Sequence, residues 1–105
     1  MKTAITSKGN GTSAQFDLRF GRAAWFCVID DETGNTEFFE NDCANLSGGA
    51  GIKASEKMAE LGVAKVISGD FGPKAKEYLN KFNIQMVILS NDSSSIETII
   101  SKLKG

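Results

Sequence analysis

The chain has 105 residues, of which 41% are hydrophobic and 24% charged, and its formal net charge is −1. This length suits a single domain, residues 1–105, around one core, and the balanced charge argues against nucleic-acid or membrane-surface partners. Histidine is absent, which excludes Ser-His-Asp and Cys-His catalysis and every metal site that needs an imidazole ligand.

The first half of the chain predicts three strands. Lys2–Thr6 forms a short first strand, and a polar loop rich in Ser, Gly and Asn follows to about Gln15. Ala24–Asp30 is rich in β-forming and aromatic residues. After a turn at residues 31–34, Asn35–Glu40 returns as the second strand of a hairpin.

The second half alternates helices with strands. A helix over about residues 49–61 ends at Gly62, a residue type that favours helix C-termini, and the buried-type strand Ala64–Ser68 follows. Pro73 occupies the first position of the next helix, whose apolar residues recur at helical spacing as far as Asn83.

The last strand, Gln85–Leu89, precedes a third helix. The segment Ser94-Ser95-Ile96-Glu97 matches the capping box that begins many helices. Behind it an isoleucine-rich apolar stripe repeats at helical spacing, which predicts a helix to the end of the chain.

These elements predict an α/β fold in three layers, α/β/α, with a mixed five-stranded sheet and helices on both faces. Each helix follows a strand, so the three helix N-termini should gather at the carboxyl edge of the parallel strands, where ligands of open α/β sheets bind. The loop Ser7–Ala23 should return to the same edge. The longest apolar run, residues 23–29, is too short for a membrane span and wrongly placed for a signal peptide, so we expect a cytoplasmic protein.

A glycine-rich segment precedes the first predicted helix. Gly48, Gly49, Ala50 and Gly51 can aim successive N–H groups at one point, and the positive end of the helix adds to them, which indicates an anion nest. Cys43, just upstream, is a candidate soft thiolate ligand for a metal or a metal–sulfur species, although a standard cluster takes four such ligands. The alternative is a glycine-rich helix start needed only for tight packing.

Two further segments are candidates for the same edge. Gly69 and Gly72 belong to a second strand–glycine–helix junction, which could instead be a plain turn. Arg19 and Arg22 flank a Phe-Gly pair around Gly21 and could clamp an anion with multi-donor guanidinium groups, or could be ordinary surface residues.

Two other patterns give weaker evidence of a functional site. Cys27 alternates with apolar residues on one face of its strand, so we expect it to be buried in the core. The segment 49–54 fits the dinucleotide fingerprint G-x-G-x-x-A, but seven residues separate the preceding strand from Gly48, and the fingerprint needs a strand running into its first glycine.

Taken in order, the segments 19–23, 48–52 and 66–75 resemble the dinitrogenase iron–molybdenum cofactor biosynthesis family. The resemblance implies a ribonuclease H-like α/β/α fold and the binding or carriage of iron–molybdenum, iron–sulfur or molybdenum–sulfur clusters, which are anionic. Some members carry a histidine where this chain has Asn45, so here ligation would fall to Cys43 or to noncovalent contacts alone. The first strand lacks the carboxylate that a two-metal nuclease needs.

The sequence therefore favours a non-catalytic carrier or assembly protein for an anionic metal–sulfur cofactor, exchanging it with donor or acceptor proteins. A phosphate or nucleotide binder, or an enzyme acting on such a ligand, is the second hypothesis, and a protein-interaction module is the third. The candidate cofactor-binding residues are Arg19, Gly21, Arg22, Gly48, Gly49, Ala50, Gly51, Gly69 and Gly72, and the candidate metal ligand is Cys43.

Overall fold

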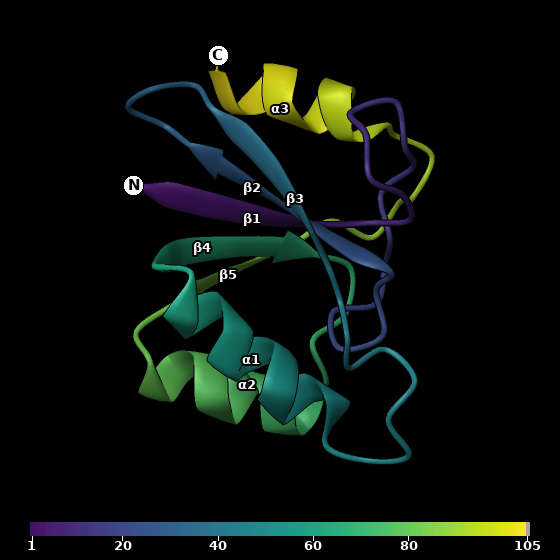
Figure 1. The fold of residues 1–105 in the computed structure, drawn as a ribbon, viewed down its shortest axis with the longest axis vertical. Helices are drawn as coiled ribbons and strands as arrows, with labels where there is room; N and C mark the ends of the chain where they lie inside the picture. Colours follow the sequence, from purple (N-terminus) through teal and green to yellow (C-terminus); the bar gives the residue numbers. More distant parts are fainter. Residues whose placement is uncertain (105) are drawn as a thin grey trace.

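The computed structural model describes residues 1–104, which form a mixed five-stranded sheet in the order β3-β2-β1-β4-β5 (Figure 1). The elements in chain order are β1 (Lys2–Ser7), β2 (Trp25–Asp30), β3 (Thr36–Glu40), α1 (Ala50–Glu60), β4 (Val63–Ser68), α2 (Gly72–Lys81), β5 (Gln85–Ile88) and α3 (Ile96–Lys104). The strand β1 pairs antiparallel with β2 and parallel with β4, while β2 with β3 is antiparallel and β4 with β5 is parallel. The predicted α/β class and mixed sheet are confirmed; the ribonuclease H-like label stays a prediction.

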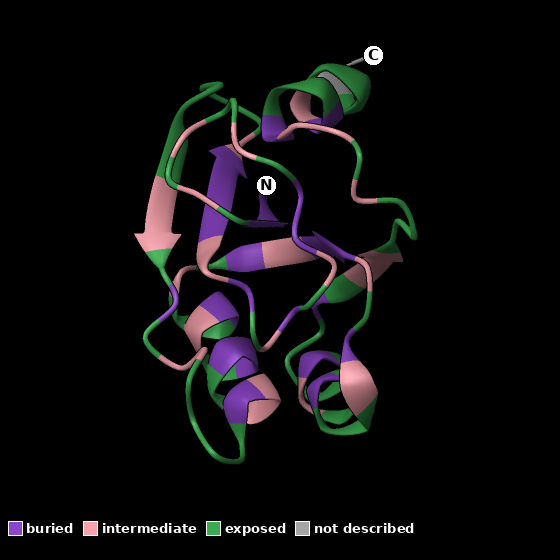
Figure 2. Ribbon diagram, turned by 90° about the vertical axis from the view of Figure 1, so that its right-hand side faces the viewer, coloured by how far each residue is buried: buried purple, intermediate pink, exposed green. Residues whose placement is uncertain are grey.

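The helices cover both faces of the sheet, as predicted. Figure 1 shows α1 and α2 side by side below the sheet and α3 above it. Each face has its own core: the first includes Phe20, Phe26 and Met58, and the second includes Phe16 and Ile96. Figure 2 shows the buried residues on the strands and on the inner sides of the helices. Apolar side chains of both cores therefore hold the three layers together.

Most predicted boundaries lie within one or two residues of the observed ones, and the expected terminators take the expected conformations. Gly62 follows α1 with φ +75°, and Asn83 follows α2 with φ +59°. The predicted position of the capping box at the start of α3 was wrong by one residue. Ser95 precedes α3, and its Oγ accepts a hydrogen bond from the backbone N–H of Thr98 at 3.2 Å, so the cap pair is Ser95 and Thr98 rather than Ser94 and Glu97.

The helix starts do not all meet. The N-termini of α1 and α2 lie together at the carboxyl edge, but α3 begins on the other face. There its first N–H groups, from Ile96 and Glu97, donate to the carbonyl oxygens of Ala14 and Thr12. Only two of the three predicted helix ends therefore contribute to one site. Among residues 1–104, none of the helices has the length and apolar character that a membrane span needs.

Candidate functional site

A cleft of about 340 Å³ opens at the carboxyl edge, where the loop before β2 meets the starts of α1 and α2. Three segments line it: residues 19–22, residues 49–51 and residues 70–75. All three were singled out from the sequence as glycine or arginine motifs. The predicted residues Arg19, Gly21, Arg22, Gly49, Ala50, Gly51 and Gly72 are among its lining residues.

Within the described chain, the N-cap residues of both helices that point into this cleft, Gly49 of α1 and Phe71 of α2, make no side-chain capping hydrogen bond, and neither first turn contains an acidic residue. By contrast α3, which lies elsewhere, has the Ser95 cap and an acidic Glu97 in its first turn. The carboxylate of Asp70, just before α2, accepts the N–H of Gly72, so the α2 N–H groups without an acceptor lie beyond Gly72. The first N–H groups of a helix lack intrahelical acceptors and carry its positive end, so two such ends make this edge suited to an anion.

Two glycines let the three segments approach at backbone distance. A Cβ atom on Gly21 would lie 2.8 Å from the nitrogen and 3.0 Å from the Cα of Gly51, which leaves no room for a side chain. A Cβ on Gly51 would in turn lie 3.3 Å from the Cβ of Ala75 in α2. The loop of residues 19–22, called the arginine loop below, thus packs directly on α1, and α1 packs directly on α2. The backbones of the three segments therefore lie close together at the cleft.

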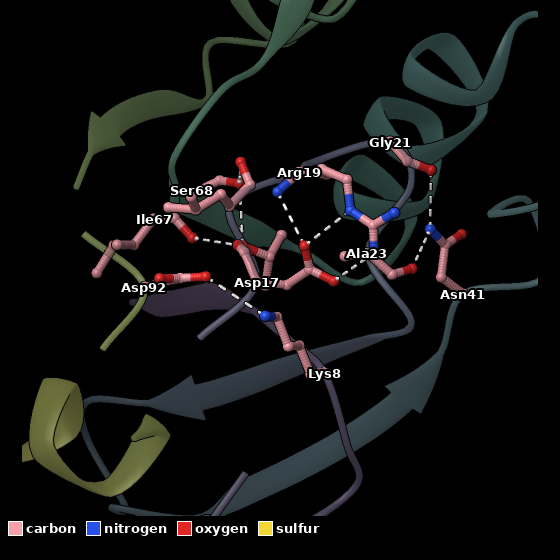
Figure 3. A network of polar contacts seen from close by, with 11 residues as sticks. Lys8, Asp17, Arg19, Gly21, Ala23, Asn41, Ile67, Ser68 and Asp92 are labelled. Atoms are coloured by element: carbon pink, nitrogen blue, oxygen red, sulfur yellow. Dashed lines mark hydrogen bonds and ion pairs between the residues drawn. The ribbon is translucent and has the colours of Figure 1, made fainter. Parts of the chain in front are cut away.

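Arg19 is held by a neighbouring carboxylate that the sequence reading missed. Its Nε and one Nη donate to the two oxygens of Asp17, each at 3.2 Å, and its backbone N–H donates to Oδ1 at 3.0 Å (Figure 3). The hydrogen bond and the charge of Asp17 raise the pKa of the Arg19 guanidinium, which is permanently cationic. Its side chain is nonetheless 64% exposed at the cleft.

Arg22 makes a different set of contacts. One Nη of its guanidinium donates to the carbonyl oxygens of Ala44, at 3.0 Å, and of Leu46, so it ties the loop before α1 to the arginine loop. Asn41 strengthens the same junction, because its amide donates to the carbonyl oxygens of Gly21 and Ala23 at 3.0 and 2.8 Å (Figure 3). Asn41 is buried, and nothing in its sequence context identified it as a residue that positions the site.

Cationic side chains outnumber acidic ones in the lining of the cleft. Arg19, Arg22 and Lys74 are its cationic lining residues, and Asp70 is the acidic one. Asp70 also has a structural role: its carboxylate accepts the N–H of Gly72 at 3.2 Å, and its carbonyl oxygen accepts the N–H of Phe20 at 3.1 Å. Lys74 was not among the predicted residues, since an exposed lysine in a helix is an ordinary surface feature.

Three predicted residues lie outside the cleft lining. Gly69 packs against Leu18, where a Cβ would come within 2.9 Å of the Leu18 Cα, so close packing explains this glycine. Gly48 lies directly before the lining residues 49–51 and is not one of them. Cys43 lines a separate hollow of about 240 Å³ between the loop after β3 and the outer side of α1. Among residues 1–104 there is no group of three Cys, Asp or Glu side chains that could hold a metal ion.

The expectation for Cys27 is confirmed. It is fully buried in the core beneath α3, and burial raises the pKa of its thiol to about 12. Its side chain is therefore a small apolar core residue rather than a ligand.

Comparison with known proteins agrees with the sequence motifs. The family model described as dinitrogenase iron-molybdenum cofactor matches residues 1–105. An uncharacterized protein of Methanocaldococcus jannaschii is 32% identical over 108 residues, which span 100% of this chain and 87% of that protein. The apo form of the orange protein from Desulfovibrio gigas has a TM-score of 0.90 and 32% identity, covering 98% of this chain and 86% of that one. A candidate NifB protein from Thermotoga has a TM-score of 0.83 and 28% identity, with coverage of 98% and 86%.

Proposed function

Because this chain belongs to the dinitrogenase iron–molybdenum cofactor family, we propose that it is a non-catalytic carrier or assembly protein for an anionic metal–sulfur cofactor. The cargo would be an iron–molybdenum, iron–sulfur or molybdenum–sulfur cluster, received from one protein and passed to another. One observation carries the proposal: two helix starts, whose N-cap residues Gly49 and Phe71 make no side-chain cap, converge on one cleft that is also lined by three cationic side chains.

The binding groups in this proposal are mostly backbone. The N–H groups at the start of α1, around Gly49, Ala50 and Gly51, and those at the start of α2, beyond Gly72, face the cargo, and Arg19 and Arg22 contribute charge-assisted donors. Sulfide and molybdate-type anions are hydrogen-bond acceptors, so such a cradle recognises them without a protein–metal bond.

The thiol of Cys43 is not required for this mode of binding, because it lines a different hollow. One thiolate also falls short of the four ligands that a standard cluster takes. The cargo would therefore enter with its metals already coordinated by sulfide and would be held by noncovalent contacts. Direct ligation by Cys43, the candidate metal ligand in the sequence, would require the loop after β3 to rearrange.

The test is anaerobic titration of the protein with tetrathiomolybdate, followed by visible absorption and by calorimetry. We expect saturable binding with a perturbed spectrum, and we expect Arg19→Ala to weaken it more than about tenfold, because a charge-assisted hydrogen bond contributes about 1.5–3 kcal/mol. Lys102→Ala is the matched control, since it removes one positive charge from α3, on the opposite face of the sheet. It should bind as the natural protein does.

Three outcomes separate the hypotheses. Binding of tetrathiomolybdate that resists a large excess of phosphate and of nucleotides supports a metal–sulfur carrier. Saturable binding of phosphate or a nucleotide together with no binding of tetrathiomolybdate would replace it with the phosphate-binder hypothesis. Binding of neither, also after reconstitution with iron, sulfide and molybdate, would leave the glycine loops as structural parts of an interaction module.

A further inference from the structure

Asp17 carries a buried carboxylate that is paired with Arg19, a residue of the cleft lining. Its side chain is only 2% exposed, whereas the Arg19 side chain that it bonds is 64% exposed. Asp17 is not among the residues that line the cleft. Figure 3 shows its two oxygens turned toward the guanidinium of Arg19.

A buried carboxylate is unfavourable unless hydrogen bonds and an opposite charge compensate for the lost water. Asp17 obtains this compensation from one residue: the backbone N–H, the Nε and one Nη of Arg19 all donate to it. Two donors from one planar guanidinium to two oxygens of one carboxylate fix the plane of the guanidinium as well as its position. Most of the Arg19 rotamers that an exposed arginine would sample are thereby excluded.

The backbone of Asp17 is fixed in turn to the sheet. Its N–H donates to the carbonyl oxygen of Thr6 at 3.0 Å, and its own carbonyl oxygen accepts the Thr6 hydroxyl. The hydroxyl of Thr6 also lies 2.9 Å from that of Ser68, at the end of β4. Hydrogen bonds therefore fix the Asp17 backbone to the carboxyl end of β1, which is itself bonded to the end of β4.

We infer that Asp17 is a positioning residue, which holds Arg19 in a fixed orientation so that the remaining N–H groups of the guanidinium are ready for an anion in the cleft. A guanidinium has five N–H donors, and Asp17 occupies two of them. The inference rests on the proposed function only for what Arg19 binds; the fixed orientation of Arg19 can be measured without any ligand.

Charge alone predicts the opposite effect from positioning. Replacing Asp17 by asparagine removes a negative charge near the cleft, which by electrostatics would strengthen the binding of an anion. If Asp17 positions Arg19, the same replacement weakens binding, because the anion must then immobilise a free arginine side chain. The sign of the change therefore distinguishes the two roles.

The first experiment needs no ligand. In a ¹⁵N-labelled protein the Nε–H signal of Arg19, assigned by its loss in Arg19→Ala, should show a rigid side chain by its heteronuclear NOE. In Asp17→Asn the NOE of this signal should fall to that of a mobile exposed arginine, since the amide places a donor against an Nη. An unchanged NOE in Asp17→Asn would overturn the inference, whatever the cargo is.

The second experiment is a double-mutant cycle of Asp17→Asn and Arg19→Ala, with tetrathiomolybdate as the probe. Asp17→Asn should weaken binding about three- to tenfold. It should cause no further loss when Arg19→Ala is already present, because only the favourable removal of a negative charge then remains. Arg19→Lys, which keeps the charge but not the planar fork, should lose affinity to a similar extent. Tighter binding by Asp17→Asn, or an equal loss in both backgrounds, would overturn positioning while leaving the proposed function intact; failure of the natural protein to bind the probe would count against the proposed function alone.

Discussion

The contact between Gly21 and Gly51 yields a quantitative prediction for Gly21→Ala. The added Cβ would lie 2.8 Å from one backbone nitrogen, 3.0 Å from a Cα and 3.1 Å from the carbonyl carbon of Ala50. These are backbone atoms at the start of α1, which cannot turn aside as a flexible side chain would. The arginine loop must therefore move away from the helix.

Overpacking of this kind costs about 1–3 kcal/mol, and the lower entropy of the unfolded alanine chain returns about 0.4–1 kcal/mol. We expect a net loss of about 1–2 kcal/mol in the free energy of unfolding. For a domain of this size that is a drop of about 5–15 °C in Tm. Because the loop that moves carries Arg19 and Arg22, the affinity for tetrathiomolybdate should fall as well.

Chemical denaturation and calorimetry measure the first effect, and Gly48→Ala provides the matched control. Among residues 1–104 no heavy atom outside its chain neighbours lies within 4 Å of a Cβ built on Gly48. That variant should be as stable as the natural protein or more stable by up to about 1 kcal/mol. If Gly21→Ala proves as stable as Gly48→Ala, the close approach of the arginine loop to α1 does not exist and the cleft must be wider.

Three further predictions concern other parts of the molecule. The Cys27 thiol has its pKa raised to about 12 in the folded state, against 9.0 ordinarily, so the folded protein holds a proton that the unfolded chain releases. The free energy of unfolding should therefore fall between about pH 9 and 12. The fall should be steeper than in Cys27→Ala by up to about 1.4 kcal/mol per pH unit, and parallel pH profiles of the two proteins would contradict this. Arg22→Ala removes the tie to the loop that carries Cys43, so maleimide should label Cys43 several-fold faster; an unchanged rate would mean that other contacts hold the loop. Ser95→Ala removes the α3 cap and should cost about 1 kcal/mol in thermal unfolding without changing affinity for tetrathiomolybdate, because α3 begins outside the cleft.

The local elements of this fold could be predicted from the sequence because each depends on nearby residues. Alternating and helical apolar periods locate strands and helices, and Gly62, Pro73 and Asn83 stop or start helices through their own backbone preferences. The arginine and glycine motifs could be located for the same reason. Once the parallel units were recognised, topology alone placed these segments at one edge.

The roles of individual residues in the candidate site were harder to predict. Gly69 and Gly51 look alike in the sequence, yet Gly69 accommodates Leu18 while Gly51 lines the cleft. Cys43 is close to the glycine-rich segment 48–51 along the chain, but the loop after β3 turns it toward the outer side of α1. Asp17 and Asn41 act through contacts that a single sequence does not reveal.

By itself the sequence determined the class of the fold and the absence of any histidine ligand, and its glycine and arginine motifs predict an anionic ligand. The tertiary structure decided which of the candidate residues share one cleft, that two helix starts rather than three meet there, and that Arg19 is anchored on a buried carboxylate. The physical reason is that backbone preferences act over a few residues, whereas a binding site depends on packing between distant segments. Contacts such as that of Gly21 with Gly51 exist only after the sheet and both helices have come together.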